Sequence, residues 1–162
     1  NKKTILILGG SQGSSPINKY FKKNIDYFNN NNLQLIWQCG NYDYKNLEKI
    51  KKKNILIKPF FNNISQIYSA SDIIISRAGA ITISELTYMS KAIILIPYPQ
   101  AAENHQKINA EYISDNKACQ LIDQNDLGSN KLINCIDDLL KDKKEIKELE
   151  QNAKKNFKTQ CN

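Results

Sequence analysis

The chain has 162 residues and a formal net charge of +7. Because chains of about this size bury roughly 70 % of the surface that they would expose unfolded, the length suits one domain with a full hydrophobic core. No apolar run approaches the roughly 18 residues that a membrane span needs, and the first residues lack a signal-peptide pattern, so we expect an intracellular soluble protein.

Short apolar runs rich in isoleucine alternate with longer amphipathic segments along the chain. Continuous apolar strands joined by helices are what a parallel sheet covered on both faces requires. The predicted fold class is therefore α/β, a Rossmann-like doubly wound parallel sheet in a single domain, 1–162. The predicted strands span 4–9, 33–38, 54–58, 72–76, 92–97 and 118–122. The predicted helices span 15–29, 43–52, 63–70, 80–90, 103–115, 126–140 and 143–158.

The stretch GGSQGS at 9–14 follows the first predicted strand, where ligands bind in open parallel sheets. Its glycines, Gly10 and Gly13 among them, allow a turn and a close backbone approach, while Ser11 and Gln12 offer hydroxyl and amide groups. The helix start that follows favours an anion. The spacing is not GxGxxG, which disfavours a nicotinamide dinucleotide, and a tight turn without a ligand is the alternative.

Three later strand ends hold further candidates. KPFFNNI at 58–64 has two phenylalanines, which could flank a planar base or fill the core. SRAGAITISE at 76–85 begins a second helix with small residues whose N–H groups would be uncovered, and the Glu85 carboxylate could accept from the two hydroxyls of a ribose. The alternative for Glu85 is a solvated surface glutamate. NHQKINA at 104–110 contains His105, the only histidine, for which the sequence shows no carboxylate partner.

The basic charge is weak evidence for a nucleic-acid partner. The sequence is rich in Asn, Lys, Ile and Tyr, which a genome biased toward A and T produces without any functional need. Since no nucleic-acid-binding motif accompanies the charge, we predict no nucleic-acid partner. Arg77 is the only arginine and is a candidate binding residue, with an exposed or ion-paired arginine as the alternative.

The cysteines and acidic residues predict no metal site. Cys39, Cys119, Cys135 and Cys161 are scattered and form no CxxC pair, so we expect reduced structural thiols rather than a zinc site or a disulfide framework. No cluster of Asp, Glu and His at ligand spacing follows a strand. We therefore predict neither a metal nor a cofactor.

GGSQGS, SRAGAITISE and NHQKINA, in this order and at these separations, resemble the C-terminal half of the MurG family. This family comprises the bacterial N-acetylglucosaminyltransferases that convert lipid I to lipid II in peptidoglycan synthesis. The resemblance covers nearly the whole chain. It implies one half of a GT-B glycosyltransferase, with UDP-N-acetylglucosamine as the donor.

The resemblance also implies donor contacts at individual positions. Phe61 matches the place where a backbone N–H and C=O meet the uracil edge, although the family residue there is usually aliphatic. Glu85 matches the residue that binds the ribose hydroxyls. His105 and Gln106 match two positions that approach the sugar, and Asn109 lies one turn beyond. The remaining substrate-binding candidates, expected near the diphosphate and sugar, are Gly10, Ser11, Gln12, Gly13, Arg77, Gly79, Ala80, Ile81 and Thr82.

The family's N-terminal half is missing from these residues. That half holds the acceptor site, the membrane-contacting patch and, we expect, the catalytic base, so no catalytic residue is assigned. The implied partners are an N-terminal acceptor domain in cis or trans, a lipid-linked acceptor and an anionic membrane surface. The implied location is the cytoplasmic face of the bacterial inner membrane, and the chain alone should be inactive. The alternatives are another UDP-sugar GT-B transferase or epimerase, or a non-enzymatic module that binds anions or nucleic acid.

Overall fold

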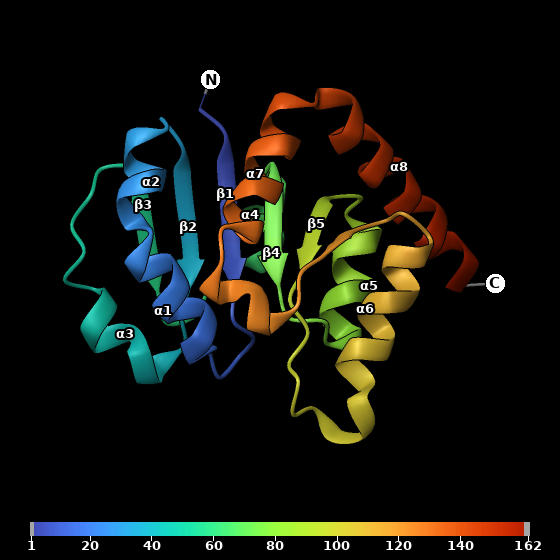
Figure 1. Ribbon diagram of the computed structural model, residues 1–162, viewed down its shortest axis with the longest axis horizontal. Helices are drawn as coiled ribbons and strands as arrows, with labels where there is room; N and C mark the ends of the chain where they lie inside the picture. Colours follow the sequence, from blue (N-terminus) through green and yellow to red (C-terminus); the bar gives the residue numbers. More distant parts are fainter. Residues whose placement is uncertain (1, 161–162) are drawn as a thin grey trace. The chain divides into compact units, whose positions relative to one another are not determined.

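The computed structural model describes residues 2–160 and contains six strands among them (Figure 1). The strands are β1 (Thr4–Leu8), β2 (Gln34–Gln38), β3 (Ile55–Lys58), β4 (Ile73–Ser76), β5 (Ala92–Leu95) and β6 (Gln120–Leu121). Their hydrogen-bonded order is β3-β2-β1-β4-β5-β6, and β1 with β2, β2 with β3 and β5 with β6 pair in parallel. This order is that of a doubly wound Rossmann sheet. The predicted fold class is confirmed.

The described chain divides into two compact units, of which the first ends at Ile75. Its helices are α1 (Ser15–Lys23), α2 (Ile25–Asn30), α3 (Asn41–Leu47) and α4 (Ile64–Ala70). Every side chain of β1 is buried, as the continuous apolar run requires. The ring centroid of Phe21 lies 5.2 Å from that of Phe28 and 6.0 Å from that of Trp37. Side chains of α1, α2 and β2 therefore pack in the same core.

The predicted helix over 15–29 is interrupted at Asn24. There the backbone turns to φ −100° and ψ 19°, and the side-chain Nδ2 donates to the Tyr20 carbonyl at 2.9 Å. An asparagine side chain competes with the backbone for helix carbonyls, which favours a helix end at this position. The apolar spacing continues across the break and therefore predicted one helix where the chain forms two.

The second unit begins at Ser76. Its helical segments are α5 (Ala80–Tyr88), the short η1 (Ala102–Asn104), α6 (His105–Asp115), η2 (Gln124–Gly128), α7 (Lys131–Lys141) and α8 (Lys143–Gln160). Helix α8 packs against α5, α7 and β5, and the rings of Tyr88 and Phe157 lie 5.1 Å apart. The predicted single-domain organisation over 1–162 stays a prediction.

Backbone turns also shorten two predicted helices of this unit. Glu103 and Asn104 have φ of 48° and 56°, in the left-handed region, so η1 is separate from α6. Ser129 is extended, which separates η2 from α7. The last strand is Gln120–Leu121, shorter than the predicted 118–122.

No helix among the described residues is long and apolar enough to cross a membrane. Cys39 and Cys119 are buried and Cys135 is partly buried, and all three are free. Burial raises the pKa of Cys39 to about 11 and of Cys119 to about 12, so both remain protonated thiols at neutral pH. Cys161 lies outside the described residues.

Candidate functional site

The loop after β1 is packed directly against the backbone after β2. Gly13 has φ 81°, and a Cβ built there would lie 2.2 Å from the Cys39 carbonyl oxygen. Gly40 has φ 78°, and its Cβ would lie 2.4 Å from the Gln12 carbonyl oxygen. Both positions therefore require glycine for conformation and for space. The sequence pattern predicted this requirement for the first loop but gave no sign that Gly40 faces it.

The side chains at the tip of this loop point away from the core. Ser11 and Gln12 are exposed, and neither side chain forms a hydrogen bond with any residue that the structure describes. Pro16 in the first turn of α1 supplies no N–H, which removes one of the expected amide donors at this helix start. What remains for a ligand is the loop itself, with Gly10, Ser11 and Gln12 at its tip.

A buried network of hydrogen bonds around Asn18 joins α1 to the backbone after β2, next to the loop after β1. Asn18, 2 % exposed, donates from Nδ2 to the Cys39 carbonyl at 2.8 Å and to Asp43 Oδ2 at 2.7 Å, and it accepts from Trp37 Nε1 at 2.9 Å. Ser15 Oγ also donates to Asp43 at 2.8 Å. Asn18 is not among the residues that the sequence pattern predicts for the site. The available signal was a polar residue among the buried positions Ile17, Tyr20 and Phe21 of α1.

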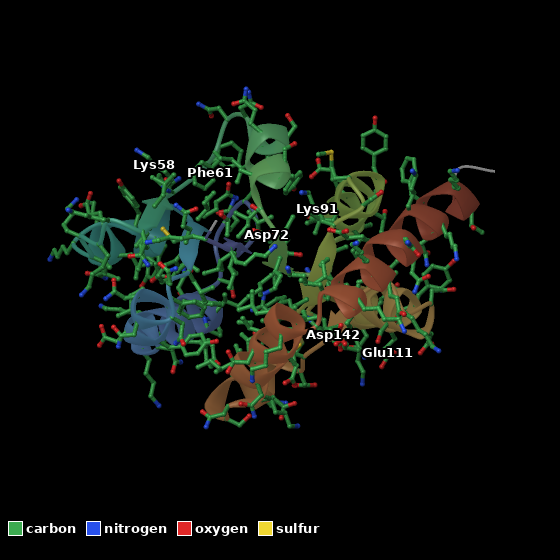
Figure 2. The ribbon with its side chains drawn as sticks, turned by 90° about the horizontal axis from the view of Figure 1, so that it is seen from above. Lys58, Phe61, Asp72, Lys91, Glu111 and Asp142 are labelled. Carbon is green, nitrogen blue, oxygen red and sulfur yellow. The ribbon has the colours of Figure 1, made fainter. Side chains whose placement is uncertain are left out.

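Gln38 connects the loop after β1 with the segment after β3. Its Oε1 accepts from the Phe61 N–H at 3.0 Å, and its Nε2 lies 3.4 Å from the Gly10 carbonyl oxygen. Figure 2 labels Phe61 just beyond Lys58, the last residue of β3. The Phe61 N–H, which the resemblance assigns to uracil, thus already donates to Gln38 within the chain. Its contact with a base stays a prediction.

In the second unit, Arg77 is buried rather than exposed. Its side chain is 8 % exposed, and Nη1 donates to the carbonyls of Ile96 and Pro97, each at 3.0 Å. Nη2 donates to Gln124 Oε1 at 2.6 Å, and the guanidinium lies 5.4 Å from the Tyr98 ring centroid. Desolvation lowers the Arg77 pKa to about 10, which leaves the group charged at neutral pH. The alternative of an exposed arginine is wrong, because Arg77 is buried and donates to backbone carbonyls.

Gln106 and Asn109 of α6 hold the peptide groups around Ala78. Gln106 Oε1 accepts from the N–H of Ala78 at 3.2 Å and from that of Tyr98 at 3.0 Å. Asn109 Nδ2 donates to the Ala78 carbonyl at 3.2 Å. Gln106, a predicted sugar contact, and Asn109, one turn beyond it, therefore fix the backbone that leads into α5. Gln106 Nε2 has no hydrogen-bond partner within the described part of the chain and remains able to donate to a ligand.

The start of α5 presents small residues without a capping side chain. Gly79 is the N-cap residue and makes no side-chain capping bond, and the first turn of α5 contains no acidic residue. Ala80 and Ile81 are exposed, and so is Glu85 further along the helix. Uncapped amides at a helix N-terminus favour an anion. The predicted arrangement of a helix start followed by a glutamate is present.

His105 begins α6 and is exposed. Its Nε2 lies 3.3 Å from Glu103 Oε2, a carboxylate partner that the sequence pattern did not show. The two side chains are 64 % and 84 % exposed, so water screens this pair. Within residues 2–160 no group of three or more His, Cys, Asp or Glu side chains is placed to hold a metal ion.

Comparison with known proteins gives related bacterial enzymes. One curated relative is the UDP-N-acetylglucosamine–N-acetylmuramyl-(pentapeptide) pyrophosphoryl-undecaprenol N-acetylglucosamine transferase of Flavobacterium psychrophilum, 40 % identical over 156 residues. The corresponding transferase 1 of Bacillus cereus is 37 % identical over 158 residues. These alignments cover 95 % and 94 % of this chain but 42 % and 43 % of the relatives. The chain thus spans less than half the length of these relatives.

Among solved structures, the crystal structure of Acinetobacter baumannii MurG is similar, with a TM-score of 0.80 and 26 % identity. The match covers 96 % of this chain and 46 % of that one. Residues 4–161 match the family model described as the glycosyltransferase family 28 C-terminal domain. Because this match spans nearly the whole chain and includes the loop after β1, Gln38 and the loop before α5, the chain belongs to the glycosyltransferase family 28 C-terminal domain family.

Proposed function

We propose that this chain is the donor-binding half of an N-acetylglucosaminyltransferase that converts lipid I to lipid II, with UDP-N-acetylglucosamine as the donor. The observation that carries the proposal is the family match across residues 4–161, joined to polar and glycine-rich segments at the strand ends. The names of the relatives state the transfer of N-acetylglucosamine to an undecaprenol-linked acceptor.

In the first unit, the proposal assigns the loop Gly10–Gly13 to the donor diphosphate and sugar. The exposed hydroxyl of Ser11 and amide of Gln12 have no competing partner among the described residues. Phe61 contributes its backbone to the uracil edge. The Phe61 N–H also donates to Gln38 Oε1. Because only backbone atoms would contact the base, this recognition does not depend on the phenylalanine side chain.

In the second unit, the proposal assigns the start of α5 to the diphosphate and Glu85 to the ribose. Gly79, Ala80, Ile81 and Thr82 supply an uncapped helix start, and about half a unit of positive dipole charge there compensates phosphate charge without a cation. Arg77 acts through its hydrogen bonds to the Ile96 and Pro97 carbonyls. His105, Gln106 and Asn109 belong to the sugar side, where Gln106 Nε2 is the free donor.

Transfer itself needs more than the donor. Holding the acceptor hydroxyl, a base and the anomeric carbon together can supply roughly 7–11 kcal/mol of the barrier reduction. We assign no base within this chain and propose that an N-terminal acceptor domain, in cis or trans, supplies it with the lipid-linked acceptor. The chain alone should therefore bind the donor without transferring sugar.

The proposed location is the cytoplasmic face of the bacterial inner membrane. The lysine-rich segment 45–58, with six lysines and one glutamate, has a net charge of +5 out of +7 for the whole chain. None of these lysines forms an ion pair with a residue that the structure describes. An anionic lipid surface attracts such a segment.

Titration calorimetry tests the proposed function. UDP-N-acetylglucosamine should bind more tightly than UDP-glucose, and a short oligonucleotide should not compete. A chain that binds the oligonucleotide and neither nucleotide sugar would contradict the proposal. Transfer to a lipid-linked muramyl-pentapeptide should be absent for the chain alone and present once a matching N-terminal domain is added.

A further inference from the structure

Gln38 is a buried side chain that hydrogen-bonds two loops without belonging to either. It is the last residue of β2 and is 6 % exposed. In the sheet register it lies opposite Leu8 of β1 and Lys58 of β3. Gly10 follows Leu8 by two residues and Phe61 follows Lys58 by three, so the Gln38 side chain links the two neighbouring chains just beyond the end of the sheet.

Both ends of the Gln38 amide are used. Oε1 accepts from the Phe61 N–H at 3.0 Å, and Nε2 donates toward the Gly10 carbonyl at the longer distance of 3.4 Å. An amide side chain carries its donor and its acceptor on two separate atoms and has no charge. Loss of the bond to Oε1 removes the acceptor of a partly buried Phe61 N–H, which costs more than the bond contributes. The Gly10 carbonyl keeps a second donor, the Gly13 N–H at 3.1 Å.

We propose that Gln38 is a positioning residue for donor binding, which sets the distance between the loop Gly10–Gly13 and the Phe61 segment. This inference rests on the proposed function, because these two segments are those assigned to the diphosphate and the base. Gln38 acts through them, and its bond to the Phe61 N–H fixes the orientation of the peptide group that joins Phe60 to Phe61, directly before the carbonyl of Phe61.

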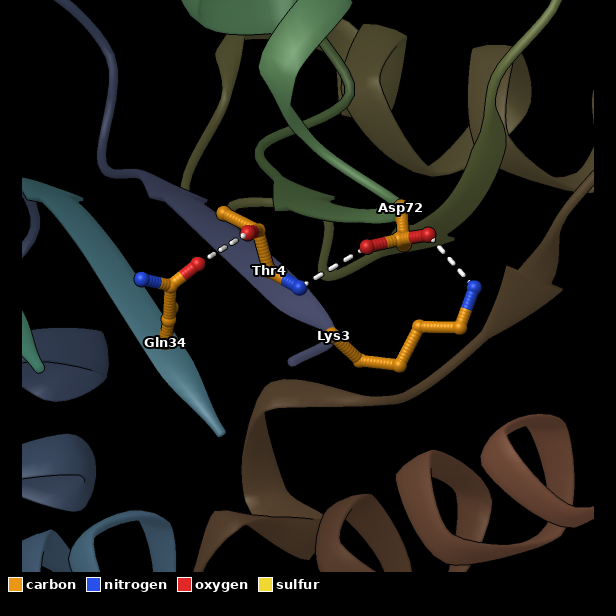
Figure 3. Close-up of polar contacts among 4 residues, drawn as sticks. All are labelled: Lys3, Thr4, Gln34 and Asp72. Carbon is orange, nitrogen blue, oxygen red and sulfur yellow. Dashed lines mark hydrogen bonds and ion pairs between the residues drawn. The ribbon is translucent and has the colours of Figure 1, made fainter. Parts of the chain in front are cut away.

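Two substitutions separate the two bonds. Gln38→Met keeps the length of the side chain and removes both hydrogen bonds. Gln38→Glu keeps an acceptor for the Phe61 N–H and cannot donate to the Gly10 carbonyl when ionised. The matched control is Gln34→Met, at the opposite end of the same strand, where Gln34 Oε1 accepts from Thr4 Oγ1 at 3.2 Å (Figure 3).

The readout is the affinity for UDP and the ratio of the affinities for UDP and CDP, with thermal unfolding measured in parallel. Uracil and cytosine present opposite donor and acceptor patterns on the edge that Phe61 would contact. A purely structural role lowers the melting temperature and leaves the UDP:CDP ratio unchanged. Amide exchange at Phe61 reports on the hydrogen bond itself, with or without ligand.

We expect Gln38→Met to bind UDP about five- to tenfold more weakly, the factor for one hydrogen bond, with a smaller UDP:CDP ratio and faster exchange at the Phe61 amide. Gln38→Glu should also bind UDP more weakly but keep the parent ratio, and Gln34→Met should match the parent. If Gln38→Met keeps the parent's UDP affinity and UDP:CDP ratio, the inference about Gln38 is wrong, while the proposed function still stands. If Gln38→Met does not fold, a changed UDP:CDP ratio in Gln38→Glu would have the same meaning. A parent chain that binds no UDP would overturn the proposed function as well.

Discussion

Replacing Gly13 with alanine tests the close packing of the loop after β1. The new Cβ would lie 2.2 Å from the Cys39 carbonyl oxygen and 2.9 Å from its carbon, where ordinary contact begins at 3.4 Å. The carbonyl must therefore retreat by about an ångström. It also accepts from Asn18 Nδ2 at 2.8 Å, so the movement strains a buried hydrogen bond.

The expected cost combines two effects. A left-handed backbone costs a non-glycine residue about 1–2 kcal/mol, and forcing an extra carbon into a packed region costs about 1–3 kcal/mol more. Gly13→Ala should lower the free energy of unfolding by about 2–5 kcal/mol. Gly10→Ala is the matched control: its φ is 86°, but no atom lies within 4 Å of the added Cβ, so only about 1–2 kcal/mol is expected.

Urea unfolding followed by the fluorescence of Trp37 measures both variants. Trp37 is the only tryptophan, is 0 % exposed and lies in the same unit as both glycines. Equal losses for Gly13→Ala and Gly10→Ala would refute the argument, because they would show that the approach to Cys39 costs nothing beyond the backbone conformation.

Four further substitutions or conditions have defined outcomes. Asp72→Ala should cost about 1–2 kcal/mol in urea unfolding, since the Thr4 N–H at 2.8 Å loses its acceptor (Figure 3); an equal loss in Glu111→Ala, whose pair with Lys107 is exposed and 3.8 Å long, would contradict this. The contribution of Cys119 to the free energy of unfolding should be complete below pH 9.0, the pKa of an unfolded thiol. It should fall as the pH rises toward about 12, the folded pKa of Cys119, because the unfolded thiol ionises first. Cys119→Ala should make the free energy of unfolding fall less steeply with pH, by up to about 1.4 kcal/mol per pH unit. An unchanged slope would contradict the assignment of this fall to Cys119. Glu85→Ala should weaken UDP binding by about 2 kcal/mol in calorimetry with little change in unfolding, and equal UDP affinity would remove Glu85 from the site. Donor binding should survive EDTA, and a loss restored by magnesium or manganese would reveal a missed ligand set.

The sequence by itself determined the α/β fold class and the position of the strand-end segments. Runs such as TILIL and IIIS are continuous and apolar, and such runs belong to strands buried on both faces, so the pattern specifies the element locally. The glycines of GGSQGS likewise indicate a special turn from residue type alone, and Gly10 and Gly13 do have positive φ.

The tertiary structure decided what the polar side chains near those segments do. Gln38 bonds to a residue 23 positions away, Gln106 to one 28 positions away, and Arg77 to carbonyls 19 and 20 positions away. No periodic pattern encodes such pairs, because periodicity reports only which side of an element faces the core, whereas a hydrogen bond depends on which two elements the fold brings within about 3 Å. For the same reason, the contacts of Gly40 with Gln12 and of Asn18 with Cys39 depend on the packing of the loop after β1 against the loop after β2.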